Sequence, residues 1–309
     1  MDAMKSGDYL ILLYHGVLPD NFAPEGSNSS GKHIPVSLFE HQMSIVANGF
    51  NPVSMLDIAQ AHMGAKELPD RAVAVTFDDG FANVPRIAFP VLRKFGIPMT
   101  FYVATGFIET GLGSWTDQLE LMLLKTDVSN IKIDIQGHNF TYQVNDVGSK
   151  VVALKDIKQR CKQIPFEQVQ LILNQVQSQC GVEFLDQSLL YAMATWPELI
   201  QMEKNTLVNL GAHTISHVPI GRVPHEKMTE EVAGSLEAIS QKTNHPCELF
   251  SYPEGQLGDF DQNCIEFLKR IGLSHCPTAI PGINNVIDTD PFLIARTMVG
   301  FEGRSFPLN

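Results

Sequence analysis

Short apolar runs recur along the chain, and several of them end abruptly in polar or charged residues. Those in the first third span residues 9–14, 72–77 and 99–104. Continuous runs of this length, without polar alternation, are typical of parallel strands that are buried on both faces. Helical patterns lie between them, at residues 37–48, where Ser37 and Glu40 resemble a capping box, and at 87–95, which Gly96 closes. The order strand, helix, strand predicts an α/β fold with parallel pairing.

This order is interrupted between residues 107 and 195 and then resumes. The interruption holds helical stretches at 117–125, 152–163 and 166–179, and an alternating segment, 131–144, with the pattern of a hairpin. After it come helices at 197–207, 226–243 and 261–271 and strands at 208–212, 248–252 and 292–298. We interpret residues 1–309 as a single catalytic domain, a distorted (β/α) barrel of about seven strands, with 107–195 as a mostly helical insertion.

The composition is that of a globular protein and excludes several partners. Hydrophobic residues make up 44% of the chain and charged residues 18%, which excludes a disordered chain and a coiled coil. Lys and Arg number 22 against 34 Asp and Glu, a net charge of −12 without a basic cluster, so nucleic acid is not an expected partner. No apolar run approaches the ~20 residues of a membrane span, and no secretory leader is recognisable. With five widely spaced cysteines, typical of reduced thiols, this predicts a cytoplasmic protein.

Two groups of polar residues follow predicted strands and could carry chemistry. Asp78 and Asp79 end the second strand; alone, such a pair before a glycine is more typical of a turn than of metal binding or base catalysis. His213 and His217 lie four residues apart after a later strand, a spacing that lets two imidazoles on one helical turn share a cation, although one could equally cap a helix while the other is exposed. Parallel strands bring both groups to the same end of the sheet. There, one carboxylate and two imidazoles would leave positions open for water and substrate.

In these residues the chain resembles the polysaccharide deacetylases of the NodB-homology type, which remove acetyl groups from N-acetylated sugars. Residues 76–80, Thr-Phe-Asp-Asp-Gly, are similar to the first motif of the family, and residues 213–217, His-Thr-Ile-Ser-His, to the second. The resemblance implies that Asp78 is the general base. It also implies a divalent metal, zinc in the first place with cobalt, nickel or iron as alternatives, held by Asp79, His213 and His217.

A third motif is matched with two departures. Residues 250–255, Phe-Ser-Tyr-Pro-Glu-Gly, resemble the segment that forms one wall of the site in this family. Ser251 stands where many relatives have an arginine, and Glu254 replaces an aromatic residue. The resemblance implies a groove formed by Tyr252, Pro253 and Glu254, in which the Glu254 amide helps to hold the oxyanion.

Two roles are left to residues outside these motifs. Arg296, at the end of the last predicted strand, is our candidate for the missing cation beside Asp78. The C-terminal Leu-x-His acid of the family is absent, and His275 has the context of a core or surface histidine. Tyr14-His15 closes the first strand and resembles a branch of the family that begins with a Tyr-His strand and lacks the C-terminal histidine. We therefore expect His15 to protonate the leaving amine, with a carbonyl-bonded, partly buried histidine as the alternative.

The hypothesis that results is a metal-dependent hydrolase acting on an N-acetylated sugar in a polysaccharide, an oligosaccharide or a glycan precursor. The alternatives are a catalytically silent carbohydrate-binding relative and a deformylase or other amide hydrolase that uses the same site. Trp115, near the start of the insertion, is expected to anchor the first inserted helix, with sugar stacking as the alternative. A homo-oligomer stays open, with the inserted helices as a dimer surface or a lid.

Overall fold

Parallel strands at the centre of the molecule carry the ends at which the candidate residues lie. The computed structural model describes residues 4–182 and 186–308. Its main sheet contains, paired in parallel in this order, β1 (Asp8–Tyr14), β5 (Ala72–Phe77), β6 (Met99–Val103) and β9 (Val208–Ala212). Each coincides with a predicted strand to within one residue. Nearly all of their side chains are buried, as continuous apolar runs predict.

The barrel is closed by short extended stretches instead of full strands. Ala212, at the end of β9, pairs with Phe250 through a single parallel bridge, and Pro277 pairs with Ile294 in the same way. The ring returns to β1 through β11 (Thr297–Met298), which runs parallel to it. The predicted distorted α/β barrel is therefore confirmed.

The full strands predicted at 248–252 and 292–298 are wrong in extent. The first is reduced to an isolated bridge at Phe250, and the second to an isolated bridge at Ile294 and the two residues of β11. On this side of the barrel, side chains occupy backbone groups that would otherwise extend the ladder. The carbonyl of Ser251 accepts a hydrogen bond from His213 (2.9 Å), and the carbonyl of Thr278 accepts one from Arg296 (2.6 Å). The irregular backbone thus serves the candidate site.

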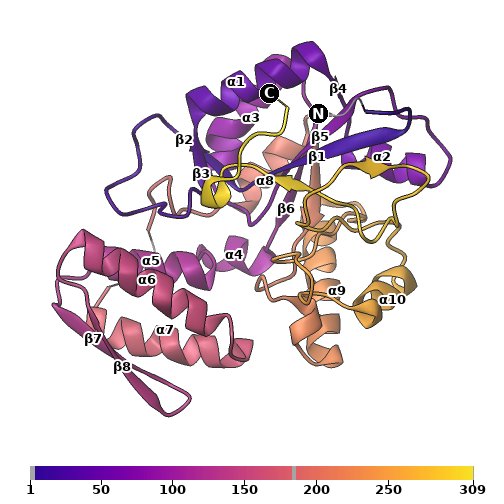
Figure 1. Ribbon diagram of the computed structural model, residues 1–309. Coiled ribbons are helices and arrows are strands. Elements are labelled where there is room, and N and C mark those ends of the chain that lie inside the picture. Colours follow the sequence, from indigo (N-terminus) through magenta and orange to yellow (C-terminus); the bar gives the residue numbers. More distant parts are fainter. Residues whose placement is uncertain (1–3, 183–185, 309) are drawn as a thin grey trace.

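Helices cover the outside of the barrel (Figure 1). They are α1 (Val36–Gly49), α2 (Met55–His62), α3 (Phe89–Phe95), α4 (Thr105–Thr110), α8 (Trp196–Glu203), α9 (His225–Thr243) and α10 (Gln262–Arg270). The predicted capping box of α1 is wrong, because the helix begins after Pro35 and Ser37 bonds to the carboxylate of Asp20 instead. The short α2 was not predicted, although Ser54 and Asp57 form its capping box.

Shorter elements complete the barrel domain. They are β2 (Gly16–Leu18), β3 (His33–Pro35), β4 (Asn51–Pro52), β10 (Asn284–Asn285), the π-helical turn η1 (Val84–Ala88) and the 3₁₀ turns η2 (Ile220–Arg222) and η3 (Phe301–Gly303). β2 pairs in parallel with β3, with Gly16 opposite His33. This pairing brings the end of the long loop before β3 back beside His15, at the carboxyl end of β1.

The insertion forms a lobe with an apolar core of its own, at the lower left of Figure 1. It contains α5 (Trp115–Lys125), the hairpin of β7 (Asn130–Ile135) and β8 (His138–Gln143), α6 (Val147–Cys161) and α7 (Phe166–Cys180). The chain returns beside the Asp78–Asp79 turn, where the Ala82 amide donates to Ala192 O and the Ala194 amide to Gly80 O, each at 2.8 Å. The exit of the insertion therefore braces that turn.

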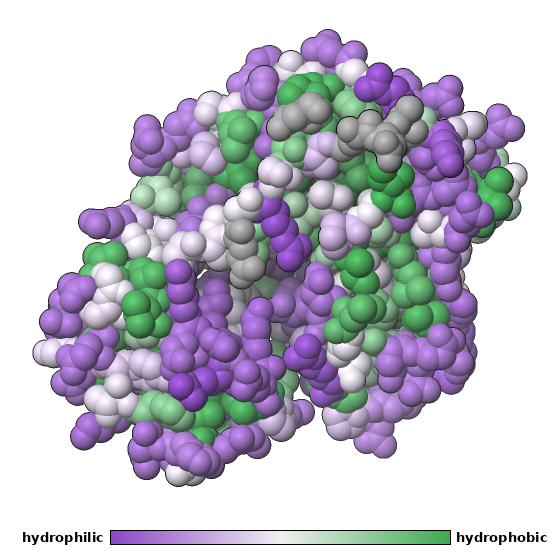
Figure 2. All heavy atoms as spheres, viewed as in Figure 1, coloured by the Kyte–Doolittle hydropathy of each residue, from purple (hydrophilic) through white to green (hydrophobic). Residues whose placement is uncertain are grey.

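The surface shows the same division. Hydrophilic residues gather over the inserted lobe, and a hollow separates it from the body of the barrel (Figure 2). Within the described residues, none of the helices has the length and apolar character that crossing a membrane requires.

The start of α4 packs closely against the loop that follows β9. The amide of Thr105 donates to Thr214 O (3.1 Å), and that of Gly106 donates to Ile215 O (2.8 Å). A Cβ added at Gly106 would lie only 2.7 Å from the Ile215 carbonyl oxygen. Position 106 is therefore restricted to glycine by close backbone approach.

We expect Gly106→Ala to destabilise the protein by about 1–3 kcal/mol, because the loop after β9 must shift to admit the methyl group. Urea unfolding measures the change. Gly49→Ala, in the last turn of α1, is the matched control, because a Cβ added there would lie 3.8 Å from the Arg71 guanidinium, an ordinary contact distance. This variant should be neutral or slightly stabilising. Equal stabilities of the two variants would contradict the close approach.

Candidate metal centre

Three side chains from the carboxyl ends of β5 and β9 bring their ligand atoms to one point. Those of Asp79, His213 and His217 all lie within 4.8 Å of one another. Asp79 Oδ1 is 3.2 Å from His217 Nε2 and 3.9 Å from His213 Nε2. It is buried and has no hydrogen-bond partner among the described residues. A buried carboxylate oxygen without a partner is costly, and a carboxylate with two imidazoles is a common donor set for zinc, so these residues fit a divalent cation.

Hydrogen bonding orients His213 for such a role. Its Nδ1 lies 2.9 Å from the carbonyl oxygen of Ser251 and 2.8 Å from the Ser251 hydroxyl. Donation from Nδ1–H to the carbonyl leaves the Nε2 lone pair facing Asp79. Burial lowers the pKa of His213 to about 4, so the imidazole is uncharged at neutral pH, the form that binds metals.

The backbone of this site is strained at four non-glycine residues. Positive φ angles occur at Asp79 (78°), Thr214 (63°), His217 (59°) and Glu254 (58°). The helical turn expected for residues 213–217 is wrong, because the segment is a loop with two left-handed residues. Left-handed non-glycine residues are uncommon and cluster at functional sites.

Glu231, on α9, holds this loop and was not found from the sequence. Its buried carboxylate accepts the amides of Ile215 (2.9 Å) and Ser216 (2.8 Å) and the Ser216 hydroxyl (2.7 Å). Lys227 lies one helical turn away and is 3.1 Å from the other side of the carboxylate. A glutamate on a long amphipathic helix has no local signal that separates this role from a solvated position.

Asp78 has a different partner from its neighbour. Arg296 donates from both terminal nitrogens to the Asp78 carboxylate, at 2.8 and 2.7 Å, and both side chains are buried. Arg296 also donates to the Thr76 hydroxyl oxygen at 3.3 Å and to the Thr278 carbonyl oxygen at 2.6 Å. Arg296 therefore places a positive charge beside Asp78, where Ser251 cannot provide one. This fork fixes Asp78 beside the candidate metal ligands, 3.7 Å from His213 Nε2.

His15 and Lys32 complete the inner wall. His15 is buried, and its Nδ1 has no hydrogen-bond partner among the described residues. Burial lowers the pKa of His15, although the charges of Asp79 and Asp78 act in the opposite direction. Lys32, which the sequence reasoning missed, lies 2.7 Å from Asp117 and 3.8 Å from Asp79. It stands alone in a loop rich in Gly, Ser and Asn, where no pattern marks a buried lysine.

Of the three groove residues expected from the third motif, only Glu254 lines the cavity. The Tyr252 ring is buried in the core, stacks on Phe260 and donates its hydroxyl to the Phe292 carbonyl (3.2 Å). Pro253 is also buried, while Glu254 lines the cavity at the metal centre. His275 is a core residue.

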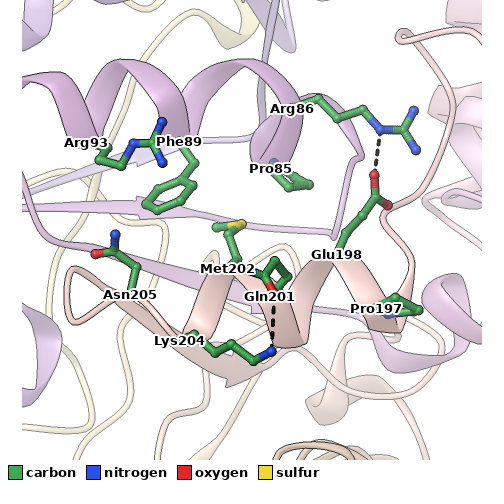
Figure 3. A pocket seen from close by; sticks show the side chains of 10 residues that line it. All are labelled: Pro85, Arg86, Phe89, Arg93, Pro197, Glu198, Gln201, Met202, Lys204 and Asn205. Carbon is green, nitrogen blue, oxygen red and sulfur yellow. Dashed lines mark hydrogen bonds and ion pairs between the residues drawn. The ribbon is translucent and has the colours of Figure 1, made fainter.

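A cavity of about 210 Å³ is lined by most of the candidate residues and by Trp115 from α5; the candidates that line it are His15, Asp78, Asp79, His213, His217 and Glu254. Trp115 packs against the core of the insertion, as expected of an anchor for the first inserted helix, and it also lines the cavity. Sugar stacking by its ring stays a prediction. A larger, more open hollow of about 580 Å³ lies elsewhere, between α3 and α8, and is bridged by the Arg86–Glu198 ion pair at 2.8 Å (Figure 3). None of the motif residues lines it, whereas Asp79, His213 and His217 together line the smaller cavity, which is therefore the candidate active site.

The fold and this geometry are those of a NodB-type deacetylase domain, and comparison with known proteins agrees. The family model for polysaccharide deacetylase matches residues 65–164 and 168–275, so the chain belongs to this family. A stretch of 70 residues, 23% of this chain, is 40% identical to the poly-beta-1,6-N-acetyl-D-glucosamine N-deacetylase of Escherichia coli strain K12. That stretch is only 9% of the length of the E. coli protein.

Solved structures share the architecture over nearly the whole chain. The Streptococcus pyogenes deacetylase PplD, in complex with acetate, has a TM-score of 0.64 at 15% identity, covering 97% of this chain and 96% of that one. IcaB from Ammonifex degensii has a TM-score of 0.60 at 20% identity, covering 96% and 94%. At these identities the likeness is one of fold.

The Asp78–Arg296 pair generates a test by double-mutant cycle. We expect Arg296→Met to lower the free energy of unfolding by about 3–5 kcal/mol, because it leaves the Asp78 carboxylate buried without its cation. Adding Asp78→Asn should recover part of this loss. Denaturant unfolding of the four proteins measures the coupling, and effects additive to within about 0.5 kcal/mol would show that the two residues do not act as a pair.

Proposed function

We propose that this protein is a metal-dependent hydrolase that removes the acetyl group from an N-acetylated amino sugar. The observation that carries the proposal is the convergence of Asp79, His213 and His217 on one point beside the buried Asp78–Arg296 pair, within one cavity. Membership of the polysaccharide deacetylase family supports the substrate class. Zinc is the metal we propose first, with cobalt, nickel and iron accepted by the same donors.

Three protein ligands would leave coordination positions open for water and substrate. When bound, a divalent cation would lower the pKa of a coordinated water toward ~7 and polarise the acetyl carbonyl. The chain holds the two imidazoles uncharged or paired with Asp79, so that three donors are presented together. The remaining steps fall to side chains around them.

Asp78 acts as the general base. Its carboxylate is forked by Arg296 and stays off the ligand set, which keeps one residue of the adjacent pair free to accept a proton. As water adds to the acetyl carbonyl carbon, Asp78 takes the water proton. The orientation of the carboxylate is fixed in advance by the guanidinium, and this removes a reorganisation cost from the step.

The oxyanion and the leaving amine meet two further groups. Glu254 lines the cavity, and its backbone amide has no hydrogen-bond acceptor within the described part of the chain, so this amide is our proposed donor to the oxyanion. His15 delivers a proton to the nitrogen as the C–N bond breaks, giving acetate and a free amine. Because burial lowers the pKa of His15, the imidazole rests uncharged, so it first takes up a proton from solvent and then passes it to the leaving nitrogen. Asp78 returns the water proton to solvent, which restores the starting protonation of both residues.

Acetate release from N-acetylglucosamine oligosaccharides, by protein loaded with zinc or cobalt, tests the proposal. Turnover that disappears in Asp78→Asn would support it. Bound metal without turnover on any acetylated sugar would favour the catalytically silent carbohydrate-binding relative. Release of formate from N-formylated sugars, without acetate from their acetylated counterparts, would favour the deformylase.

Metal binding should stabilise the folded chain. At a free zinc concentration 100 times the dissociation constant, the free energy of unfolding should rise by about 2.7 kcal/mol, because the three ligands are assembled only in the folded state. Thermal or urea unfolding with and without zinc measures the gain. It should vanish in Asp79→Ala and persist in His138→Ala, an exposed histidine of the inserted hairpin. A gain that survives Asp79→Ala would place the metal elsewhere.

Replacement of His15 should separate catalysis from metal binding. We expect His15→Ala to lower kcat by about 10²–10⁴, the loss typical of a missing acid–base group. Zinc content, measured by atomic absorption, should stay at the wild-type level. A protein that loses its zinc with this substitution would make His15 a ligand, and unchanged kcat would assign the proton transfer to another residue.

A further inference from the structure

Cationic side chains gather around the metal-centre cavity, although the chain as a whole carries a net charge of −12. The cations that line it are Lys32, Lys158, Lys162 and Arg304. Lys32 is paired with Asp117 at 2.7 Å, and the Lys162 ammonium is 3.7 Å from the Glu254 carboxylate. Lys158 and Arg304 are left to be explained.

Lys158 lies on α6, the central helix of the insertion, and is partly buried. The acids that face it have other partners. Asp117 holds Lys32, and Glu120 accepts the hydroxyl of Tyr191 at 3.0 Å. No ion pair or hydrogen bond joins the Lys158 ammonium to another residue of the described part of the chain. Burial and the nearby charge of Lys32 lower the pKa of Lys158, although the charges of Asp117 and Glu120 act in the opposite direction.

Arg304 reaches the same cavity from the other end of the sequence. It follows η3, beside Phe301, and is exposed. Its guanidinium is 3.9 Å from the sulfur of Met298, which is a weak acceptor and no counter-charge. Two cations from separate parts of the chain therefore line the cavity without an ion pair to any carboxylate among the described residues.

The acetamido group that the proposed reaction consumes is neutral, so it provides no negative charge to pair with Lys158 and Arg304. Asp78 is already neutralised by Arg296, and Asp79 would be neutralised by the metal it ligates. With metal bound, the cavity would therefore carry an excess of positive charge. Charge complementarity then favours a substrate that carries an anionic group.

We propose that Lys158, assisted by Arg304, binds an anionic substituent of the sugar, a carboxylate or a phosphate, next to the acetamido group. The inference rests on the proposed function and narrows its substrate to acidic N-acetylated sugars. Lys158 is a specificity-determining residue supplied by the insertion. The neutral homopolymer named for the E. coli relative is not the substrate class that this cavity favours.

Three substrates test the inference with zinc-loaded protein: N-acetylglucosamine, its 1-phosphate and its 6-carboxylate. We expect the better of the two acidic sugars to exceed the neutral one in kcat/KM by about tenfold or more. The preference should weaken as salt is raised from 0.05 to 0.5 M. The two acidic substrates distinguish phosphate from carboxylate as the anion. Equal kcat/KM for the neutral and both acidic sugars would overturn the inference.

Variants on α6 locate the effect. Lys158→Gln should reduce the acidic-to-neutral ratio of kcat/KM about tenfold, and Lys158→Arg should keep most of it, because the charge is retained. Lys155→Gln, an exposed lysine of the same helix that does not line the cavity, is the matched control and should leave the ratio unchanged. A ratio in Lys158→Gln equal to that of the wild type would overturn the assignment.

Failure of the inference and failure of the proposed function give different results. Turnover of neutral and acidic sugars at equal rates rejects the acidic substituent and leaves the deacetylase proposal intact. Acetate release from none of them contradicts the deacetylase proposal. In that case calorimetric titration with N-acetylglucosamine 1-phosphate still decides the anion site: affinity lost about tenfold in Lys158→Gln supports it, and equal affinity of the two proteins overturns it.

Discussion

The left-handed backbone at Asp79 is the constraint on which the candidate site depends. In an extended strand, adjacent side chains point to opposite faces, so Asp78 and Asp79 would not reach a common cavity. A φ of 78° turns Asp79 toward the two histidines, while Asp78 keeps its fork with Arg296. Such a residue costs about 1–3 kcal/mol and persists only where its surroundings determine it. Here the Asp79 carbonyl accepts the Ala104 amide, and the returning insertion pairs with the next residue, Gly80.

The loop after β9 also contains left-handed residues, and contacts from other elements hold it in place. Thr214 and His217 are left-handed, and the loop has no regular hydrogen bonds of its own to hold them. Glu231 replaces the missing backbone partners by accepting two consecutive amides, and α4 fills the other side through Gly106. Both supports come from elements that pack on the barrel, so the position of the histidines depends on tertiary packing. A substitution at Gly106 that shifts this loop should therefore also move His213 and His217, although residue 106 does not contact them.

Local signals in the sequence identified some parts of this structure and not others. Continuous apolar runs located β1, β5, β6 and β9, because strands buried on both faces have a pattern that survives without any neighbour. Paired carboxylates and the His-x-x-x-His spacing pointed to the ligand group, but the spacing suggested a helical turn where the structure has a strained loop. Lys32 and Glu231 escaped notice because their roles are defined by partners far away in the chain. The short closing stretches were overestimated as strands, since pairing through single bridges depends on contacts that no sequence window contains.

The Asp78–Arg296 pair explains why those stretches are irregular. Arg296 has to place a fully buried guanidinium against Asp78 and also satisfy its Nε–H, which it does on the Thr278 carbonyl. That carbonyl, and the Ser251 carbonyl that receives His213, are then committed to side chains. A regular ladder on this side of the barrel would compete for the same oxygens. Ser251 and the irregular closure thus belong to one arrangement. The Ser251 carbonyl accepts a hydrogen bond from His213, a candidate metal ligand, and the positive charge beside Asp78 comes from Arg296 in the neighbouring stretch of chain.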